Sequence, residues 1–303
     1  MRSTPILLLI IVLISTIYGN NVTQNYTPIV MWHGMGDSCC FPFSLGSIKK
    51  LLERSLENKV YVTSLEIGGS YVRDYESGYF IHPDKQLQDA CNQIANNKIL
   101  SNGFNAIGFS QGSQFLRALV QRCPAAKVKN LISLGGQHQG VYGLPNCPSL
   151  TTKSCEYFRE MLNYAAYTGW VQKRLVQATY WHDPMNENLY KSKSTFLAEI
   201  NNERKINQKY IDRLQKLENF VMVKFWNDTI VQPVDTQWFG FYKPGSDSET
   251  LTMEESDIYT KDRLGLKKMK EDGKIKFIAV EGNHLQIKND WFIANIIDVY
   301  LKN

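Results

Sequence analysis

The sequence feature that most constrains this chain is the pentapeptide Gly-Phe-Ser-Gln-Gly at residues 108–112, a G-x-S-x-G motif. A short apolar run at 104–107 precedes it, and a helical pattern at 114–120 follows it. A strand, this motif and a helix in that order are typical of a nucleophile elbow, in which a serine occupies a sharp strand-to-helix turn. The glycines let the backbone fold back closely, and Ser110 then lies at the positive end of the helix. The alternative is a glycine-rich turn with a structural serine, but the flanking strand and helix favour a catalytic serine.

Length and composition indicate an ordinary globular protein. The 303 residues can bury one large core or one core with an inserted lobe. Hydrophobic residues make up 43% and charged residues 21% of the chain, with no internal repeat. The formal net charge of +5 comes from scattered Lys and Arg, so the sequence gives no indication of nucleic-acid binding.

The first residues predict a secretory signal peptide over 1–19 and a mature chain over 20–303. Arg2 supplies the positive start, residues 6–14 are continuously apolar, and small residues lead to a cleavage site near Gly19. A membrane anchor is the alternative, but the stretch 5–17 is shorter than the roughly 20 residues that span a bilayer. No other stretch is apolar and long enough, which predicts no transmembrane span. Three sequons agree with secretion and predict glycosylation at Asn21, Asn25 and Asn227.

The order of apolar segments predicts an α/β fold. Runs rich in β-branched and aromatic residues predict strands at 28–32, 60–65, 104–109, 131–134, 220–225 and 275–280. Helical patterns lie between or after them at 45–56, 85–95, 111–121 and 291–301. Continuously apolar strands that alternate with helices indicate a mostly parallel sheet with helices on both faces.

One interval, about 135–219, shows helical patterns but no buried strand. The patterns lie at 155–166, 170–178 and 195–201. We expect this interval to form a helical insertion lobe above the sheet, on the side where ligands bind in open α/β folds.

A serine nucleophile needs a base and an acid that orients the base. Of five histidines, His284 follows the last strand through a short loop and precedes the last helix, where an α/β-hydrolase places its base. The acid should follow a strand between serine and histidine in chain order, which favours Asp228, with Asp235 as the alternative. Either carboxylate could instead serve in a helix cap or turn.

The negative oxygen that forms during acyl transfer needs two backbone N–H donors. One should belong to Gln111, directly after the serine, and the other to Met35 in the loop His-Gly-Met-Gly-Asp that follows the first strand. The loop could also be a plain strand-to-helix turn, but its glycines allow the close backbone approach that such a site requires.

Six cysteines behind a signal peptide predict up to three disulfides, although free buried thiols are the alternative. Spacing does not fix the pairing. Cys147 and Cys155 could close a local loop, and Cys91 and Cys123 each lie near the end of a predicted helix. The adjacent residues Cys39 and Cys40 could form a ring or pair elsewhere.

Long stretches of this chain resemble the palmitoyl-protein thioesterases, lysosomal enzymes with the α/β-hydrolase fold. The resemblance covers nearly the whole mature chain. It is carried by WHGMGDSCC (32–40), GFSQG (108–112), NLISLGGQHQG (130–140), YWHDP (180–184), WFGFY (238–242) and EGNHLQ (281–286). Runs of this length are far more specific than the G-x-S-x-G motif alone.

The resemblance implies Ser110 as nucleophile, Asp228 as acid and His284 as base. It also implies the disulfide pairs Cys39–Cys40, Cys91–Cys123 and Cys147–Cys155, which spacing alone leaves open. One small departure is Asn283, where the resemblance leads us to expect Asp beside the base.

The implied activity is the hydrolysis of palmitoyl thioesters on the cysteines of S-acylated proteins or peptides, with transient contact with lipid and no metal or cofactor. An oxygen-ester lipase of the same fold and an inactive lipid-binding protein are the alternatives. The implied location is the lysosome, reached by the secretory pathway, or else the exterior. The acyl chain requires an apolar groove, and core packing is the alternative role of its candidate residues: Trp181, Ile230, Val231 and Leu285.

Overall fold

The computed structural model describes residues 26–143, 162 and 164–302. Its centre is a six-stranded sheet of order β2-β1-β3-β4-β5-β8 in which every neighbouring pair is parallel. The strands are β1 (Ile29–Trp32), β2 (Val62–Ser64), β3 (Phe104–Phe109), β4 (Val128–Leu134), β5 (Asn219–Phe225) and β8 (Ile275–Val280). These are the six predicted segments, so the predicted α/β class with a mostly parallel sheet is confirmed.

The sheet is covered on both faces, which is why its central strands are continuously apolar. Successive side chains of a strand point to opposite faces. In β1, Ile29 and Met31 therefore join one hydrophobic cluster while Val30 and Trp32 join the other. The edge strand β8 instead alternates between buried and more exposed residues.

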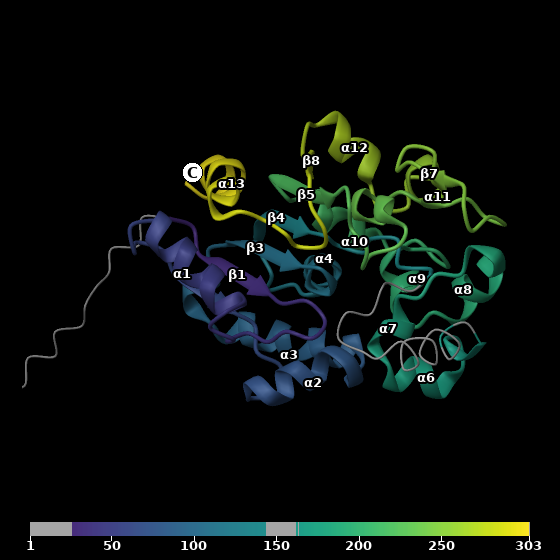
Figure 1. Cartoon of the computed structure of the whole chain (residues 1–303), viewed down its shortest axis with the longest axis horizontal. Coiled ribbons are helices and arrows are strands. Elements are labelled where there is room, and N and C mark those ends of the chain that lie inside the picture. Colours follow the sequence, from purple (N-terminus) through teal and green to yellow (C-terminus); the bar gives the residue numbers. More distant parts are fainter. Residues whose placement is uncertain (1–25, 144–161, 163, 303) are drawn as a thin grey trace, which may run out of the picture.

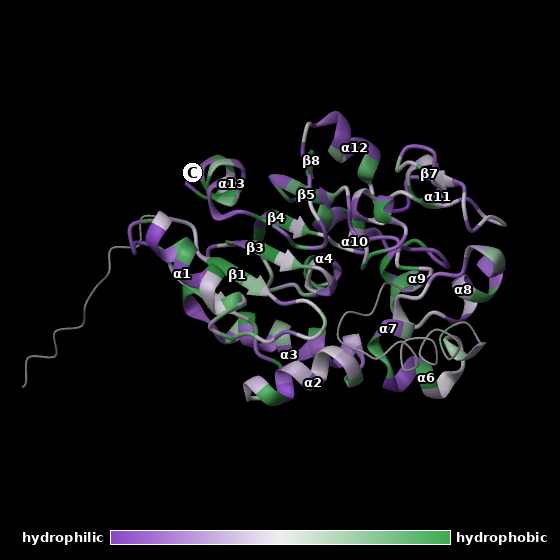
Figure 2. Ribbon diagram, in the orientation of Figure 1, coloured by the Kyte–Doolittle hydropathy of each residue, from purple (hydrophilic) through white to green (hydrophobic). Residues whose placement is uncertain are grey.

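Different helices complete each cluster. α1 (Leu45–Ser55) and the C-terminal helix pack on one face. The C-terminal helix begins as α13 (Asn289–Phe292) and continues as a π-helix over Ile293–Leu301. The opposite face is covered by α3 (Pro83–Asn96), α4 (Gln111–Arg122), α10 (Gln208–Leu214) and α12 (Leu266–Glu271). Figures 1 and 2 show this arrangement, with hydrophobic colouring along β1, β3 and β4 inside the fold.

The helix α2 (Tyr71–Phe80) was not expected from the sequence. Its buried face consists of Asp74, Ser77 and Gly78, whereas Tyr71, Val72, Tyr75 and Phe80 are exposed. A search for an apolar stripe at helical spacing misses such a helix, because the stripe that faces the protein is polar. Ser70 caps the helix by accepting a hydrogen bond from the N–H of Arg73.

The interval 135–219 contains several short helices. They are α6 (Gly169–Arg174), α7 (Val176–Thr179), α8 (Glu187–Lys193), α9 (Leu197–Ile200) and the longer α10. In the described part of this interval, Val141 and Trp181 form an isolated β-bridge. Figure 1 shows α6 to α9 together on one side of the molecule, away from α1 and α13, whereas α10 packs against α4. That the interval acts as one lobe remains a prediction.

Smaller elements complete the described chain. The two-stranded antiparallel sheet pairs β6 (Phe241–Tyr242) with β7 (Thr250–Leu251). A short helix, α11, covers Asp257–Thr260, and 3-10 turns cover Lys98–Leu100, Pro184–Asn186 and Val234–Trp238.

The described residues contain two disulfides, Cys39–Cys40 and Cys91–Cys123. The second joins α3 to the end of α4, two helices on the same face of the sheet. Cys147, Cys155, the predicted signal peptide and the sequons at Asn21 and Asn25 lie outside the described residues. Among the described helices, none has the length and apolar character needed to cross a bilayer.

Candidate active site

Ser110 stands at the turn between the last residue of β3 and the first residue of α4. Its φ of 51° and ψ of −121° are uncommon for a residue with a side chain, and such strained positions concentrate at functional sites. Its N–H donates to the carbonyl of Leu134 at the end of β4 (2.7 Å), which fixes the turn against the sheet. The local structure is therefore the strand-to-helix elbow that the motif predicted.

The glycines on either side of Ser110 are required because the backbone is crowded there. A Cβ on Gly112 would lie 2.3 Å from the carbonyl oxygen of Trp32 and 2.5 Å from that of His33. A Cβ on Gly108 would lie 2.4 Å from the Cα of Ser113. The start of α4 thus packs directly on the end of β1, which places the following loop beside Ser110.

Asp228 and His284 form a buried pair. The Nδ1 of His284 lies 2.6 Å from the Oδ2 of Asp228, and the Asp228 side chain is fully buried. The same carboxylate accepts three further hydrogen bonds, from the N–H groups of Ile230 and Val231 and from the side-chain amide of Gln237. A buried carboxylate needs such donors to offset its lost hydration, and together they fix its orientation.

Asp235, the alternative acid, is placed elsewhere. Its Oδ1 accepts from the ammonium of Lys224 (3.0 Å), and 40% of its side chain is exposed. The Lys224 ammonium also lies over the rings of Trp226 and Trp238, at 4.1 and 4.0 Å from their centroids. Asp235 therefore belongs to a separate cation–π and ion-pair cluster, whereas Asp228 is the carboxylate that contacts His284.

Ser110 and His284 both adjoin the end of β4. Ser110 is bonded to Leu134, and a Cβ on the next residue, Gly135, would lie 3.0 Å from the Cε1 of His284. In the described part of the chain, the Oγ of Ser110 accepts a hydrogen bond from the side chain of Gln137 (3.0 Å) and makes none with His284. Our sequence reasoning gave Gln137 no role, although it lies in a motif that carries the family resemblance.

The loop after β1 runs directly past the serine. A Cβ on Gly34 would lie 3.1 Å from the Cβ and 3.8 Å from the Oγ of Ser110. Met35 follows at once and is partly exposed. On the other side, Gln111 begins α4, so its N–H is among the first four, which have no partner within a helix. The two residues predicted to donate to an oxyanion therefore belong to the two segments that flank Ser110.

Asn283 connects the acid and base loops. Its Oδ1 accepts from the backbone N–H groups of Thr229 (2.9 Å) and His284 (2.7 Å). Thr229 directly follows Asp228, so one amide side chain spans the two loops. The structure thus gives a positional role to the residue at which this chain departs from the expected pattern.

The four other histidines do not contact Asp228, and His82 instead contacts the hydroxyl of Thr195 (2.9 Å). His33 is buried against Asp74. His138 accepts from or donates to the hydroxyl of Ser133, and burial, with a smaller contribution from Arg117, lowers its pKa well below the usual value. His182 is stacked between two aromatic rings and bonded to Glu187 (2.7 Å). Of the five histidines, all of which lie in the described part of the chain, only His284 contacts the carboxylate of Asp228, as expected of the base.

The four candidate acyl-binding residues lie in two places. Ile230 and Val231 directly follow the acid loop, and Leu285 follows His284. Trp181 is buried in a separate small cluster with residues of α6 and α7. Tyr142 connects the two places, because its ring lies 5.4 Å from that of Trp181 and its N–H donates to the carbonyl of Gln232.

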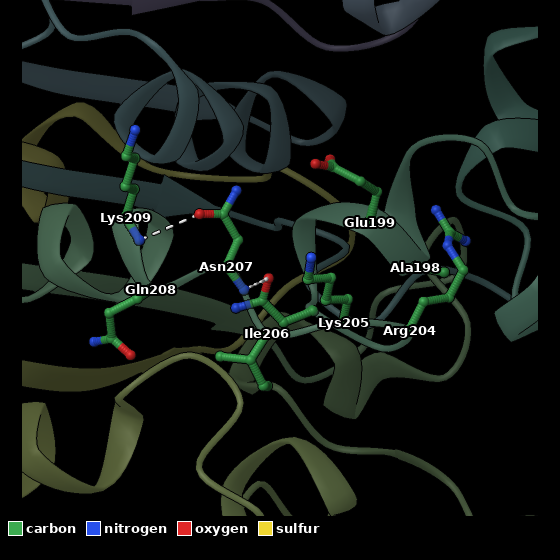
Figure 3. A pocket seen from close by; sticks show the side chains of 9 residues that line it. Ala198, Glu199, Arg204, Lys205, Ile206, Asn207, Gln208 and Lys209 are labelled. Carbon is green, nitrogen blue, oxygen red and sulfur yellow. Dashed lines mark hydrogen bonds between the residues drawn. The ribbon is translucent and has the colours of Figure 1, made fainter.

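An open cavity of about 520 Å³ lies elsewhere, along the segment 198–209. Figure 3 shows that its walls combine the apolar residues Ala198 and Ile206 with polar and charged side chains, among them Glu199, Arg204, Lys205 and Lys209. None of the residues predicted for catalysis or acyl binding lines it. The size of this cavity therefore gives no reason to place the reaction there.

The fold gives the structural class of this protein, and comparison with known proteins gives its family. The parallel sheet with its elbow serine is the α/β-hydrolase fold. A family model described as palmitoyl protein thioesterase matches residues 28–284. The chain is 48% identical to palmitoyl-protein thioesterase 1 of Caenorhabditis elegans over 300 residues, covering 99% of each chain. It is 33% identical to palmitoyl-protein thioesterase 3 of Dictyostelium discoideum, covering 85% of this chain and 84% of that one.

This chain therefore belongs to the palmitoyl-protein thioesterase family. Among solved structures, a thioesterase from the prodiginine pathway of Streptomyces coelicolor covers 85% of this chain and is matched over 82% of its own length. Its TM-score is 0.43 at 12% identity.

Replacing Gly112 by Ala is expected to destabilise the fold by at least about 1–3 kcal/mol, the usual cost of overpacking a core, because the new Cβ would meet two backbone carbonyls that cannot rotate away. Gly169→Ala is the matched control, since a Cβ there meets nothing within 4 Å. Denaturant unfolding of both variants measures the difference. An equally small effect of the two substitutions would contradict the packing described for the elbow.

Proposed function

We propose that this protein hydrolyses long-chain fatty acyl thioesters, in particular palmitoyl groups on the cysteines of S-acylated proteins or peptides. Ser110 is the nucleophile, His284 the base and Asp228 the acid of a catalytic triad. The observation that best supports this assignment is the buried Asp228–His284 pair at the end of β4, to which the Ser110 turn is also bonded. Membership of the palmitoyl-protein thioesterase family supports the substrate class.

The reaction proceeds in two halves. The Oγ of Ser110 forms a bond with the thioester carbonyl carbon, and its proton passes to the Nε2 of His284. When the carbon–sulfur bond breaks, the cysteine sulfur leaves and takes the proton from His284. Water then gives a proton to His284 and attacks the acyl-serine. As the bond to the Oγ of Ser110 breaks, His284 returns that proton to the Oγ, and the fatty acid is released.

Asp228 keeps the base in the correct state during both halves. Because its Oδ2 lies 2.6 Å from the Nδ1 of His284, it holds the proton on that nitrogen and leaves Nε2 free to accept one. The negative charge then stabilises the imidazolium that forms. The three other donors to Asp228 keep the carboxylate from turning away.

The oxyanion hole consists of the N–H groups of Met35 and Gln111. Gly34 brings the first segment into contact with Ser110, and the start of α4 supplies the second donor. Each step therefore uses this chain's own groups, without a metal or a cofactor.

An apolar groove between the acid loop and the helical interval 135–219 binds the acyl chain. Ile230, Val231 and Leu285 line its inner end beside the triad, and Trp181 lines its outer part. Tyr142 supports this arrangement, because it joins the Trp181 cluster to the segment after Val231. A long tail needs walls that the sheet edge alone does not offer.

The proposed targeting and modification of the chain are those that the resemblance to this family implies. Residues 1–19 direct it into the secretory pathway, residues 20–303 form the hydrolase with its helical lobe, and the enzyme reaches the lysosome. Two relatives with lower identity carry lysosomal thioesterase in their names, one from Drosophila melanogaster and one from Homo sapiens. Asn227, the described member of the three sequons, is exposed, as a glycan acceptor must be. Asn21, Asn25 and the Cys147–Cys155 disulfide belong to the same proposal.

Ser110→Ala is expected to lower turnover of a palmitoyl-cysteine thioester by roughly 10⁴-fold or more, because the hydroxyl that forms the acyl-enzyme is lost. The thermal unfolding midpoint should stay close to that of the unchanged protein. Wild-type protein should be assayed in parallel on a palmitoyl oxygen ester. If the alanine variant keeps its turnover, the assignment of the triad is wrong. If the wild type prefers the oxygen ester, the protein is a lipase instead.

Asp228→Asn is expected to lower kcat by about 10⁴-fold, as loss of the orienting carboxylate does in related triads. Asp235→Asn is the matched control and should cost less than about tenfold, because Asp235 contacts the ammonium of Lys224 and not His284. Rates must be expressed per titrated active site, since Asn227 is a predicted glycan acceptor next to Asp228. A reversed order of the two effects would show that the acid is Asp235.

Trp181→Ala should lower kcat/KM for long acyl chains more than for short ones. Each methylene that loses its contact removes up to about 0.8 kcal/mol, or roughly fourfold. Trp238→Ala, a partly buried tryptophan of the Lys224 cluster, is the control and should affect all chain lengths alike. Kinetics over a series of acyl thioesters measures this slope. An equal loss at every length in the Trp181 variant would mean that the ring only packs the lobe.

A further inference from the structure

The fully buried carboxylate of Asp74, on α2, holds three separate segments together. Its Oδ2 accepts from the N–H of Cys39 (2.7 Å) and from the hydroxyl of Ser38 (3.2 Å). Its Oδ1 accepts from the N–H of Ile67 (2.8 Å) and lies 3.0 Å from the Nε2 of His33. A carboxylate with no exposed surface is costly unless its lone pairs are used in this way, so the site is built around this charge.

His33 transmits the position of Asp74 to the loop beside Ser110. Its Nδ1 lies 2.8 Å from the carbonyl oxygen of Gly34, and its Nε2 faces the carboxylate. Both partners are acceptors, so the arrangement suits the doubly protonated imidazolium. The Nε2–H is not aligned for a hydrogen bond, which makes the contact with Asp74 an ion pair. The attraction therefore depends on the positive charge of His33.

The same face of α2 also holds the other side of the site. Gly78 is four residues after Asp74, and residues at this spacing share a helix face. Its carbonyl accepts from the side-chain amides of Gln111 (3.1 Å) and Gln177 (3.1 Å). One short helix thus fixes the loop that contains Met35 and the residue that directly follows Ser110.

We propose that Asp74 is a positioning residue for the reaction. Through His33 it holds the Met35 backbone opposite Gln111, so that the oxyanion hole stays formed while His33 is charged. The inference rests on the proposed function, because it assigns the loop its catalytic purpose. Asp74 itself touches neither Ser110 nor the reacting atoms.

The ion pair makes this support dependent on pH. Burial by itself lowers the pKa of His33, but Asp74, the Gly34 carbonyl and Asp37 together raise that pKa above its usual value of 6.5. Asp74 from α2 and Asp37 from its own loop are the charged groups that act on His33 in the described structure. The attraction is complete below the ordinary pKa of histidine and is lost as the pH rises through the higher folded-state value. The loop is therefore held best under acidic conditions.

Asp74→Asn tests the proposal, because it keeps the shape of the side chain and removes the charge. We expect kcat on a palmitoyl thioester to fall roughly 10- to 100-fold, less than the 10²–10³ lost with an oxyanion donor itself. KM should change less than about threefold. The fall of kcat on the alkaline side of the wild-type pH profile should disappear, since His33 then loses the carboxylate that raises its pKa and its charge no longer holds the loop. Asp74→Glu should restore part of kcat and the alkaline fall.

Ser38→Ala is the matched control, since it removes a hydrogen bond from the same carboxylate and leaves His33 in place. Its pH profile should match that of the wild type. Proton NMR of the His33 ring in the full chain should show titration above pH 6.5 in the wild type and at lower pH in Asp74→Asn. If that variant does not fold, His33→Gln should remove the same alkaline fall.

Ser110→Ala, measured beside these variants, separates the two proposals. If it retains turnover, both the proposed function and this inference fail. If it is inactive while Asp74→Asn keeps the wild-type kcat, or loses kcat with an unchanged alkaline fall, only the positioning role is overturned.

Discussion

The close packing of the β3–α4 turn on the end of β1 is the constraint on which the rest of the site depends. Gly112 has no room for a side chain between the carbonyls of Trp32 and His33, so the start of α4 is pressed against the first strand. Two consequences follow at once. Ser110 is held in a strained backbone conformation, and the loop that leaves β1 must pass within contact of it. The sheet supplies this geometry because β1 and β3 are adjacent and parallel.

Two buried carboxylates then fix the two sides of the serine. Asp228 orients His284 on the β4–β5–β8 side, and Asp74 orients the loop on the β1 side. Each carboxylate has four partners that come from several chain segments, which is how a protein keeps such a charge in its interior. The two sites differ in the protonation that they require. Base catalysis needs a neutral His284, whereas the ion pair with Asp74 needs a charged His33.

The parts of this arrangement that the sequence predicted are those encoded locally. The six strands are short apolar runs, and the elbow is five consecutive residues with a strand before and a helix after them. The order of Ser110, Asp228 and His284 along the chain follows from the order of strands in this fold. The residue Asp74 could not be found in this way, because its partner His33 lies on another element and α2 buries polar residues. The sequence favours Asp228 over Asp235 but leaves both open, and the structure shows that Asp228 contacts His284 whereas Asp235 contacts Lys224.

The hydrogen bond from Gln137 to the hydroxyl of Ser110 bears directly on how the resting site becomes reactive. The amide of Gln137 donates to the oxygen of Ser110, the proposed nucleophile, and its own carbonyl oxygen accepts from Gln114. An intramolecular hydrogen bond between neutral groups contributes only about 1 kcal/mol net, which is roughly a factor of five in an equilibrium. The bond uses a lone pair of the serine oxygen and leaves the serine proton free for another acceptor. If Ser110 is the nucleophile that we propose, the contact therefore orients it at small energetic cost.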